Sequence, residues 1–342
     1  MPKVVLMLAG AMLACAVHAD SEVTLYGVAD AYGAWQKGDR SELKVDSGGL
    51  SGSNVGVRAS HDLPHGLKAV AVVEAGIDLK NGTSGADGRT WGRQAYVGLS
   101  GELGKLTLGR QYTPTFNALD CDDAFQTGAG SAISSAIVTT VGGTRIDNAI
   151  AYELPDMGDY HANLMAAAAE SGLGSDRNGS FVSGSVRYAP GKLGVSLTWG
   201  RINRLAPADM AVESLLLAGI YDFGSFSLSG GVQGVRHLAS GDGTYVNRTE
   251  AYAGVHVPMG SGTVWLGGGT GASNGVHDSR ATQASAAYLY ALDGNTTLYG
   301  VLTRLDNGRR TAYTVDTATG TGPSVSPGIA ASALQLGGHY RF

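Results

Sequence analysis

The sequence predicts an all-β protein: a 16-stranded antiparallel transmembrane β-barrel with a long third loop folded into its lumen. Three observations predict it. Runs of about ten residues alternate between polar side chains and apolar or small ones, which is the pattern of a strand with two different faces. Glycine is abundant, at 53 of 342 residues. After the first 19 residues no segment is apolar over the 18 or more residues that a spanning helix needs.

Residues 1–19 are expected to be a cleaved signal peptide. Lys3 is their only charge, residues 4–17 are apolar but too short to span a bilayer, and Val17-His18-Ala19 places a small residue before Asp20, as a signal-peptidase site requires. A lipoprotein signal with Cys15 as the lipidated residue is the alternative. Residues 20–342 then form a single barrel domain, which retains only Cys121 and therefore has no internal disulfide.

The strands follow one another along the whole chain. The expected strands are 23–36, 52–63, 66–78, 91–101, 104–112, 145–154, 159–170, 179–189, 192–203, 212–223, 225–237, 247–258, 262–272, 279–292, 295–306 and 332–342. Very short connections rich in turn residues alternate without exception with longer ones. This alternation is typical of an up-and-down barrel of the outer membrane, with tight turns at one rim and long loops at the other. A soluble sandwich would need Greek-key connections instead.

Side-chain parity assigns the two faces of each strand. Arginine or lysine facing lipid at the bilayer midplane costs about 2–4 kcal/mol, so charges that alternate with apolar residues should face a wet lumen. By this argument Arg58, Lys68, Glu74 and Arg145 face the lumen.

Parity is less favourable for two other arginines. Arg93 and Arg110 share a face with apolar residues, and a bulge near the strand end could turn each of them inward. The alternative is an interfacial arginine that extends to the lipid headgroups.

The longest non-periodic segment is 113–144, and it carries Asp120, Asp122 and Asp123. A loop of this length inside a compact domain needs a functional reason. We expect it to fold inward and to set its acids, together with Glu74, against the basic wall of a water-filled pore. A calcium site is the weaker interpretation, because the acids lack the alternating spacing of a calcium loop.

The last strand alternates up to the final residue and ends on an aromatic side chain, at Tyr340 and Phe342. Pairing this strand with 23–36 would close the barrel and remove both sheet edges. Sixteen strands enclose an aqueous channel rather than a packed core.

Several motifs together resemble one family, the trimeric general porins of Gram-negative bacteria, of the neisserial and β-proteobacterial type. The resemblance covers the chain from residue 20 onwards and is carried by Val23-Thr24-Leu25-Tyr26-Gly27, Gly66-Leu67-Lys68-Ala69 with Glu74, Gly92-Arg93-Gln94-Ala95-Tyr96-Val97-Gly98-Leu99, Leu108-Gly109-Arg110-Gln111-Tyr112-Thr113-Pro114, Arg145 with Asn148, and Tyr340-Arg341-Phe342.

The resemblance implies a homotrimer whose third outer loop, here 113–144, narrows the pore. It implies that Asp120 and Asp123 face a ladder of wall residues, here Arg58, Lys68, Arg93, Arg110 and Arg145. The terminal Phe342 is similar to the signal read by the barrel-assembly machinery, an expected transient partner. Asn54, Ala151 and Cys121 depart from the family pattern and weaken the positive wall, so the sign of ion selectivity stays open.

The expected function is an outer-membrane porin: a passive channel for ions and small hydrophilic solutes, with outer-membrane lipid around it. No cofactor, metal or catalytic residue is expected. The elbow-like stretch 271–275 is not followed by a helix pattern, and the chain has no basic run for nucleic acid. The alternatives are a substrate-specific channel, for organic anions for example, a non-conducting adhesin, and a barrel enzyme, for which no Ser/His or Asp/His pair can be assembled.

Overall fold

The computed structural model describes residues 21–342 except 87, 170–177, 205–210 and 240–244, so the expected signal peptide lies outside the described residues. Its strands are β1 Ser21–Lys37, β2 Ser41–Ser47, β3 Asn54–Asp62, β4 Lys68–Asp78, β5 Thr83–Ser84, β6 Gln94–Gly101, β7 Gly104–Tyr112, β8 Arg145–Glu153, β9 Tyr160–Ala167, β10 Asn178–Tyr188, β11 Leu193–Arg204, β12 Ala211–Asp222, β13 Ser227–Ala239, β14 Tyr245–Met259, β15 Gly262–Ser273, β16 Ala281–Ala291, β17 Thr296–Asn307 and β18 Ala331–Arg341. The helices are α1 Pro114–Asp122 and the short 3₁₀ helix η1 Pro64–Gly66.

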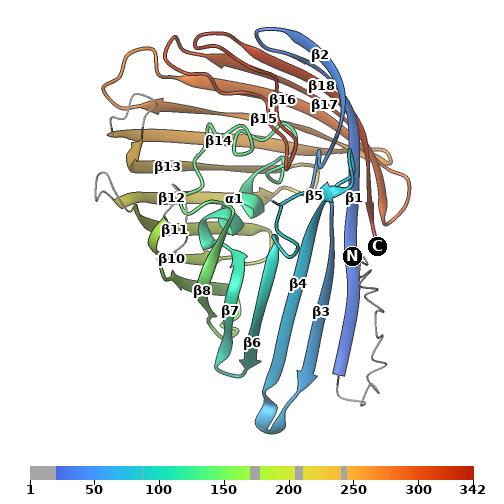
Figure 1. Cartoon of the computed structure of the whole chain (residues 1–342), viewed down its shortest axis with the longest axis vertical. Helices are drawn as coiled ribbons and strands as arrows, with labels where there is room; N and C mark the ends of the chain where they lie inside the picture. Colours follow the sequence, from blue (N-terminus) through green and yellow to red (C-terminus); the bar gives the residue numbers. More distant parts are fainter. Residues whose placement is uncertain (1–20, 87, 170–177, 205–210, 240–244) are drawn as a thin grey trace, which may run out of the picture.

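The sheet is a closed antiparallel ring of sixteen barrel strands, as the sequence predicts (Figure 1). Neighbours in the chain pair with each other, and β1 pairs with β18 to close the ring. Two of the eighteen labelled strands are not separate barrel strands. β2 and β3 pair with successive parts of β1 and form one interrupted strand, and β5 pairs with only two residues of β4.

The prediction that 37–51 is a loop was wrong for most of its length. β2 occupies Ser41–Ser47 and pairs with Ala31–Lys37 of β1, so the first hairpin continues as regular sheet. The hairpin turn is confined to residues 38–40. Residues 48–53, between β2 and β3, interrupt the strand and turn inward.

The outer face of the barrel is apolar, as the strand alternation requires. Leu25, Val97, Leu197, Leu217 and Leu336 are 50–64% exposed although they are hydrophobic, whereas their neighbours in sequence point inward and are mostly polar or small. Only lipid can cover such a surface over most of the ring. Within the described residues, no helix has the length and apolar character needed to cross a membrane.

Aromatic side chains gather beside the short turns, where a girdle of an outer-membrane barrel is expected. The pairs Tyr160–Tyr188, Tyr221–Phe223 and Phe223–Phe226 have ring centroids 4.6–4.7 Å apart. Trp35, Trp91 and Trp199 lie near the opposite, long-loop rim and are partly exposed. The two rims therefore mark the two edges of the apolar band.

Candidate functional site: a cavity between the third loop and the barrel wall

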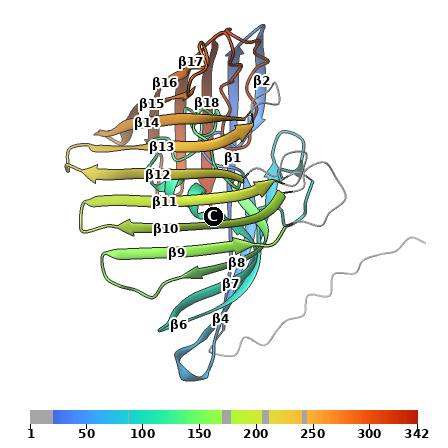
Figure 2. The ribbon, with the colours of Figure 1, turned by 90° about the vertical axis from the view of Figure 1, so that its left-hand side faces the viewer.

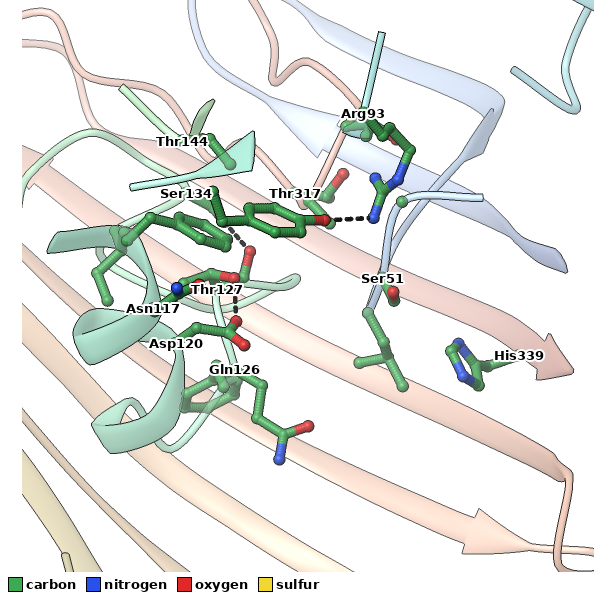
Figure 3. Close-up of a pocket in the computed structure, with 18 of the residues that line it drawn as sticks. Ser51, Arg93, Asn117, Asp120, Gln126, Thr127, Ser134, Thr144, Thr317 and His339 are labelled. Carbon is green, nitrogen blue, oxygen red and sulfur yellow. Dashed lines mark hydrogen bonds between the residues drawn. The ribbon is translucent and has the colours of Figure 1, made fainter. Parts of the chain in front are cut away.

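A cavity of about 620 Å³ lies between the 113–144 loop and the barrel wall (Figure 3). Besides strand residues, Arg93 and the short turn at Gly294 and Asn295, three longer chain segments line it. They are the 113–144 loop, the strand break at 48–53 and the last long loop, 307–331.

The 113–144 loop begins with the nine-residue helix α1, which the strand pattern did not predict. Thr113 is its N-cap, with its Oγ1 accepting a hydrogen bond from the Phe116 N–H at 3.2 Å, and Pro114 occupies the first helical position. Thr113 Oγ1 also donates to the Gly143 carbonyl at 2.8 Å, which brings the two ends of the loop together. The Thr-Pro pair is a recognised helix-start signal and could have predicted the helix.

Side chains on the inner face of the barrel hold the loop. Arg187 donates to both oxygens of Asp122 at 2.8 and 2.9 Å, and the Ser196 hydroxyl donates to Asp122 at 2.9 Å. Asp122 is completely buried. Asp122 therefore attaches α1 to β10 and β11 and does not line the cavity.

The second half of the loop is held by other strands. Glu250 on β14 accepts hydrogen bonds from the Thr139 N–H at 2.7 Å and from its hydroxyl at 2.6 Å. The Gln283 amide on β16 donates to the Gly130 carbonyl at 2.8 Å. His256 contacts the Ala124 carbonyl and stacks on Trp265. These attachments run from β10 round to β16.

The loop acids have different surroundings. Asp120 lines the cavity and accepts a hydrogen bond from the Thr127 hydroxyl at 2.6 Å (Figure 3). Partial burial raises the pKa of the Asp120 carboxyl above its ordinary value, and that hydrogen bond opposes the shift. Asp123 is buried and accepts from the Thr127 N–H at 3.0 Å, and burial likewise raises its pKa. Asp123 thus organises the loop from within.

The basic side of the cavity is built around Tyr112. Its hydroxyl accepts hydrogen bonds from Arg93 at 2.8 Å and from Arg145 at 2.7 Å, and the Arg145 guanidinium lies 4.4 Å from the centre of its ring. Arg93 also donates to Glu74 at 2.5 Å, and Tyr26 donates to Glu74 at 2.9 Å. Glu74 is buried by these contacts and compensates the charge of Arg93.

Arg145 has no such compensation. Among the described residues it forms no ion pair, and both Arg93 and Arg145 line the cavity.

Arg93 precedes the first residue of β6, so strand parity does not fix its direction. This is why parity left its orientation open.

The other predicted basic residues lie elsewhere. Arg58 is exposed on the inner face of β3, 5.2 Å from the centre of the Tyr26 ring, and does not line the cavity. Lys68 follows the short turn η1 and pairs with Asp62 at 3.3 Å, at the opposite rim from the long loops. Arg110 sits at a register shift between β7 and β8 and pairs with Asp147 at 2.7 Å, outside the cavity lining.

The strand break at 48–53 is a second inward element, which the sequence analysis missed. Asp30 on β1 is completely buried and accepts hydrogen bonds from the N–H groups of Gly49, Leu50 and Ser51 at 2.9–3.1 Å. Tyr299 donates to Asp30 at 2.6 Å. The available signal was three closely spaced glycines, Gly48, Gly49 and Gly52, where the expected loop 37–51 meets the expected strand 52–63.

The cavity continues toward the C-terminus through two residues of β18. His339 Nδ1 lies 3.1 Å from Asp30 Oδ2, and Arg341 Nε donates to His339 Nε2 at 3.1 Å. Both side chains line the cavity. Arg341 was expected only as part of the closing strand and is a further basic residue of the site.

The 307–331 loop also turns inward. Thr317 Oγ1 donates to the Gly48 carbonyl at 2.9 Å, and Thr319 Oγ1 donates to the Ser47 carbonyl at 3.1 Å. Thr317 and Thr319 line the cavity. Loop length alone did not distinguish this segment from the other long loops.

The two predicted C-terminal aromatics lie at the seam of the barrel. Phe342 and Gly27 exchange two backbone hydrogen bonds of 3.0 and 3.1 Å, and the Tyr340 and Phe342 rings stack with centroids 6.1 Å apart. A Cβ at Gly27 would lie 2.3 Å from the Phe342 ring, so this close approach requires glycine. No group of three or more metal-binding side chains occurs in the part of the chain that the structure describes.

Comparisons with known proteins agree with this architecture. The family model described as Gram-negative porin matches residues 4–310. Outer membrane porin protein 32 of Delftia acidovorans is 31% identical over 322 residues, covering 90% of each chain. The major outer membrane protein P.IB of Neisseria gonorrhoeae is 32% identical over 130 residues, 36% of each chain.

A solved structure is similar over nearly the whole barrel. The anion-selective porin from Comamonas acidovorans superposes with a TM-score of 0.83 at 28% identity, covering 94% of this chain and 100% of the other. The family expected from the sequence motifs is therefore confirmed. The chain belongs to the Gram-negative porin family and is an outer-membrane porin that forms a water-filled channel for passive diffusion.

Proposed function

We propose that this porin is a diffusion channel with a preference for anions, set at the cavity beside the 113–144 loop. Four charged side chains line that cavity: Arg93, Arg145, Arg341 and Asp120. Glu74 compensates Arg93, which leaves two positive groups against one acid. Fixed charges at a narrow neck with low-dielectric walls focus the field on passing ions.

The observation that carries this proposal is the Arg145 guanidinium, which lines the cavity with no carboxylate partner among the described residues. The expected acids do not balance it, since Asp122 is compensated by Arg187 and Asp123 does not line the cavity. The name of the Comamonas acidovorans protein, an anion-selective porin, supports the same sign. No chemical step is part of the proposal.

The test is single-channel recording in a planar bilayer under a potassium chloride gradient. We expect stepwise conductance and a reversal potential of the sign that chloride preference gives. A reversal potential of the opposite sign, from barrels that run as folded, heat-modifiable protein, would contradict the anion preference. Absence of conductance from such barrels would contradict the channel and favour a non-conducting barrel.

The preference should also depend on pH through Asp120. The pKa of this carboxyl is raised, so lowering the pH neutralises it earlier than an ordinary aspartate and removes the only acid of the cavity lining. We expect the anion preference to increase as pH falls. The measurement compares wild type with Asp120→Asn, which isolates the contribution of this carboxyl. The variant should have the higher preference at neutral pH, and the two should converge in acid.

We also propose that three copies of this chain associate and that their contact includes an outer hollow of about 690 Å³ on β1, β3, β4, β6 and β7. Small side chains leave this hollow in the outer surface, among them Ala59, Ala69, Ala71 and Gly98, and allow another chain to approach closely. Conductance steps in triplets would support a trimer. The barrel-assembly machinery, reading the end of β18 at Phe342, remains the expected transient partner.

A further inference from the structure

A second cavity lies on the outside of the barrel, over β11 to β14, which run side by side in Figure 2. Its volume is about 440 Å³. It sits near the ends of these strands that lead into the long loops, because β11 ends at Arg204, β12 begins at Ala211 and β14 begins at Tyr245. The cavity is therefore at the outer edge of the apolar band.

Strand register arranges its residues in two rows. Trp199, Leu215 and Gly234 are direct cross-strand partners and form the row nearer the membrane centre. Arg201, Glu213 and Arg236 are direct partners in the row nearer the long loops. Both rows face outward.

The direction of these rows follows from burial. Ser214 and Val235 lie between the two rows on their strands and are only 3% and 1% exposed, because they point to the barrel interior. Trp199 and Leu215 are 40% and 54% exposed. Alternation on β12 and β13 then places Glu213 and Arg236 on the outer surface.

The hollow exists because residue 234 is a glycine and has no side chain to fill it. A Cβ built at this position meets no atom within 4 Å, so the glycine leaves open space rather than relieving a close contact. Trp199 and Leu215 border this space on one side. On the other side lie Thr249 and Asn274, whose side chains share a hydrogen bond of 3.1 Å.

The outer row carries an excess of positive charge. Arg201 pairs with Glu213 at 3.1 Å, with both side chains partly exposed. Arg236 is exposed and forms no ion pair among the described residues. The row therefore presents one uncompensated guanidinium next to an apolar hollow.

We propose that this outer cavity binds one phosphorylated lipid of the outer leaflet, with an acyl chain in the Gly234 hollow and a phosphate group at Arg236. Arginine binds phosphate through several donors at once, and tryptophan at a membrane interface lies at the level of the headgroups. Basic pockets at the membrane edge bind anionic headgroups in the same way. A soluble anion would gain nothing from the apolar hollow. A second copy of this chain is proposed above to bind at the hollow on β1, β3, β4, β6 and β7, and a two-fold contact here would place Arg236 opposite an identical charge.

The test measures retention of bis-phosphorylated lipid A by the purified, folded barrel in detergent, using native mass spectrometry. Wild type should retain one molecule per barrel. Arg236→Glu removes the phosphate partner and Gly234→Leu fills the hollow, and each should weaken retention by roughly tenfold. Arg304→Glu is the matched control, because Arg304 is exposed and pairs with Asp306, and the change in charge is the same.

Three outcomes would overturn the proposal. They are unchanged retention in Arg236→Glu and Gly234→Leu, an equal loss in Arg304→Glu, and displacement of the lipid by inorganic phosphate at millimolar concentration. Folding of each variant is verified by heat-modifiable migration in a gel. Arg236→Gln, which keeps the length of the side chain without its charge, replaces Arg236→Glu if that variant does not fold, and should show a smaller loss in the same direction.

Discussion

Replacing Arg145 with glutamate is expected to reverse the sign of ion selectivity. The change places a negative charge where the uncompensated guanidinium of the cavity now lies against the Tyr112 ring. A unit charge about 8 Å from a passing ion contributes roughly 0.5 kcal/mol in water. Reversing it favours cations and disfavours anions by about 1 kcal/mol each, so the cation-to-anion permeability ratio should change by about thirtyfold without screening, and by less as the salt concentration rises. The measurement is the reversal potential in a potassium chloride gradient.

Two further variants separate the local effect from other causes. Arg145→Gln removes the charge but keeps a hydrogen-bond donor for the Tyr112 hydroxyl, and it should give an intermediate reversal potential. Arg304→Glu makes the same change in charge on an exposed residue that does not line the cavity, and it should leave the potential unchanged. Equal shifts in Arg145→Glu and Arg304→Glu would mean that the net charge of the barrel, not the cavity, sets selectivity.

Deleting residues 116–138 is expected to raise single-channel conductance, by about twofold or more, because the solute then meets the full width of the lumen. The remaining residues can close the gap without moving the strands. Thr113 N donates to the Thr144 carbonyl at 3.1 Å, so the two ends of the loop are already adjacent. Conductance of purified, folded protein in a symmetric salt solution measures the effect.

The side chains that held the loop should tolerate its removal. Arg187 and Glu250 lose their loop partners, but they face the lumen and become solvated by its water instead of staying buried without a partner. Equal or lower conductance from the folded deletion variant would show that the loop does not limit the pore. A matched deletion in the 79–90 loop, which does not line the cavity, should leave conductance unchanged.

The barrel itself could be predicted because its constraint is repeated along the chain. Every strand must alternate so that lipid meets apolar side chains and water meets polar ones, and this pattern is visible without knowledge of distant contacts. The site could be predicted only in part. Arg145 was identified by parity, and Asp120 by its place in the long loop, because both depend on local sequence.

The rest of the site depends on contacts between segments far apart in the chain. Nothing near Asp122 indicates that Arg187 will compensate it, and nothing near Asp30 indicates that its carboxyl will hold the 48–53 segment. Such pairs are set by the curvature of the closed barrel, which local patterns do not encode. The helix α1 is different, since Thr113 and Pro114 were a local signal that the strand analysis did not use.

The buried carboxylate of Asp30 has a consequence for the order of assembly. Its partners Tyr299 and His339 are 269 and 309 residues away in the chain, on the last two strands. Contacts of such separation form late, since loop-closure entropy must be overcome before they contribute. The Asp30 carboxyl, which already binds the 48–53 segment within the first hairpin, can therefore acquire its full set of partners only when the ring of strands closes. An incomplete ring has no finished passage, so the membrane acquires a channel of defined width in one step.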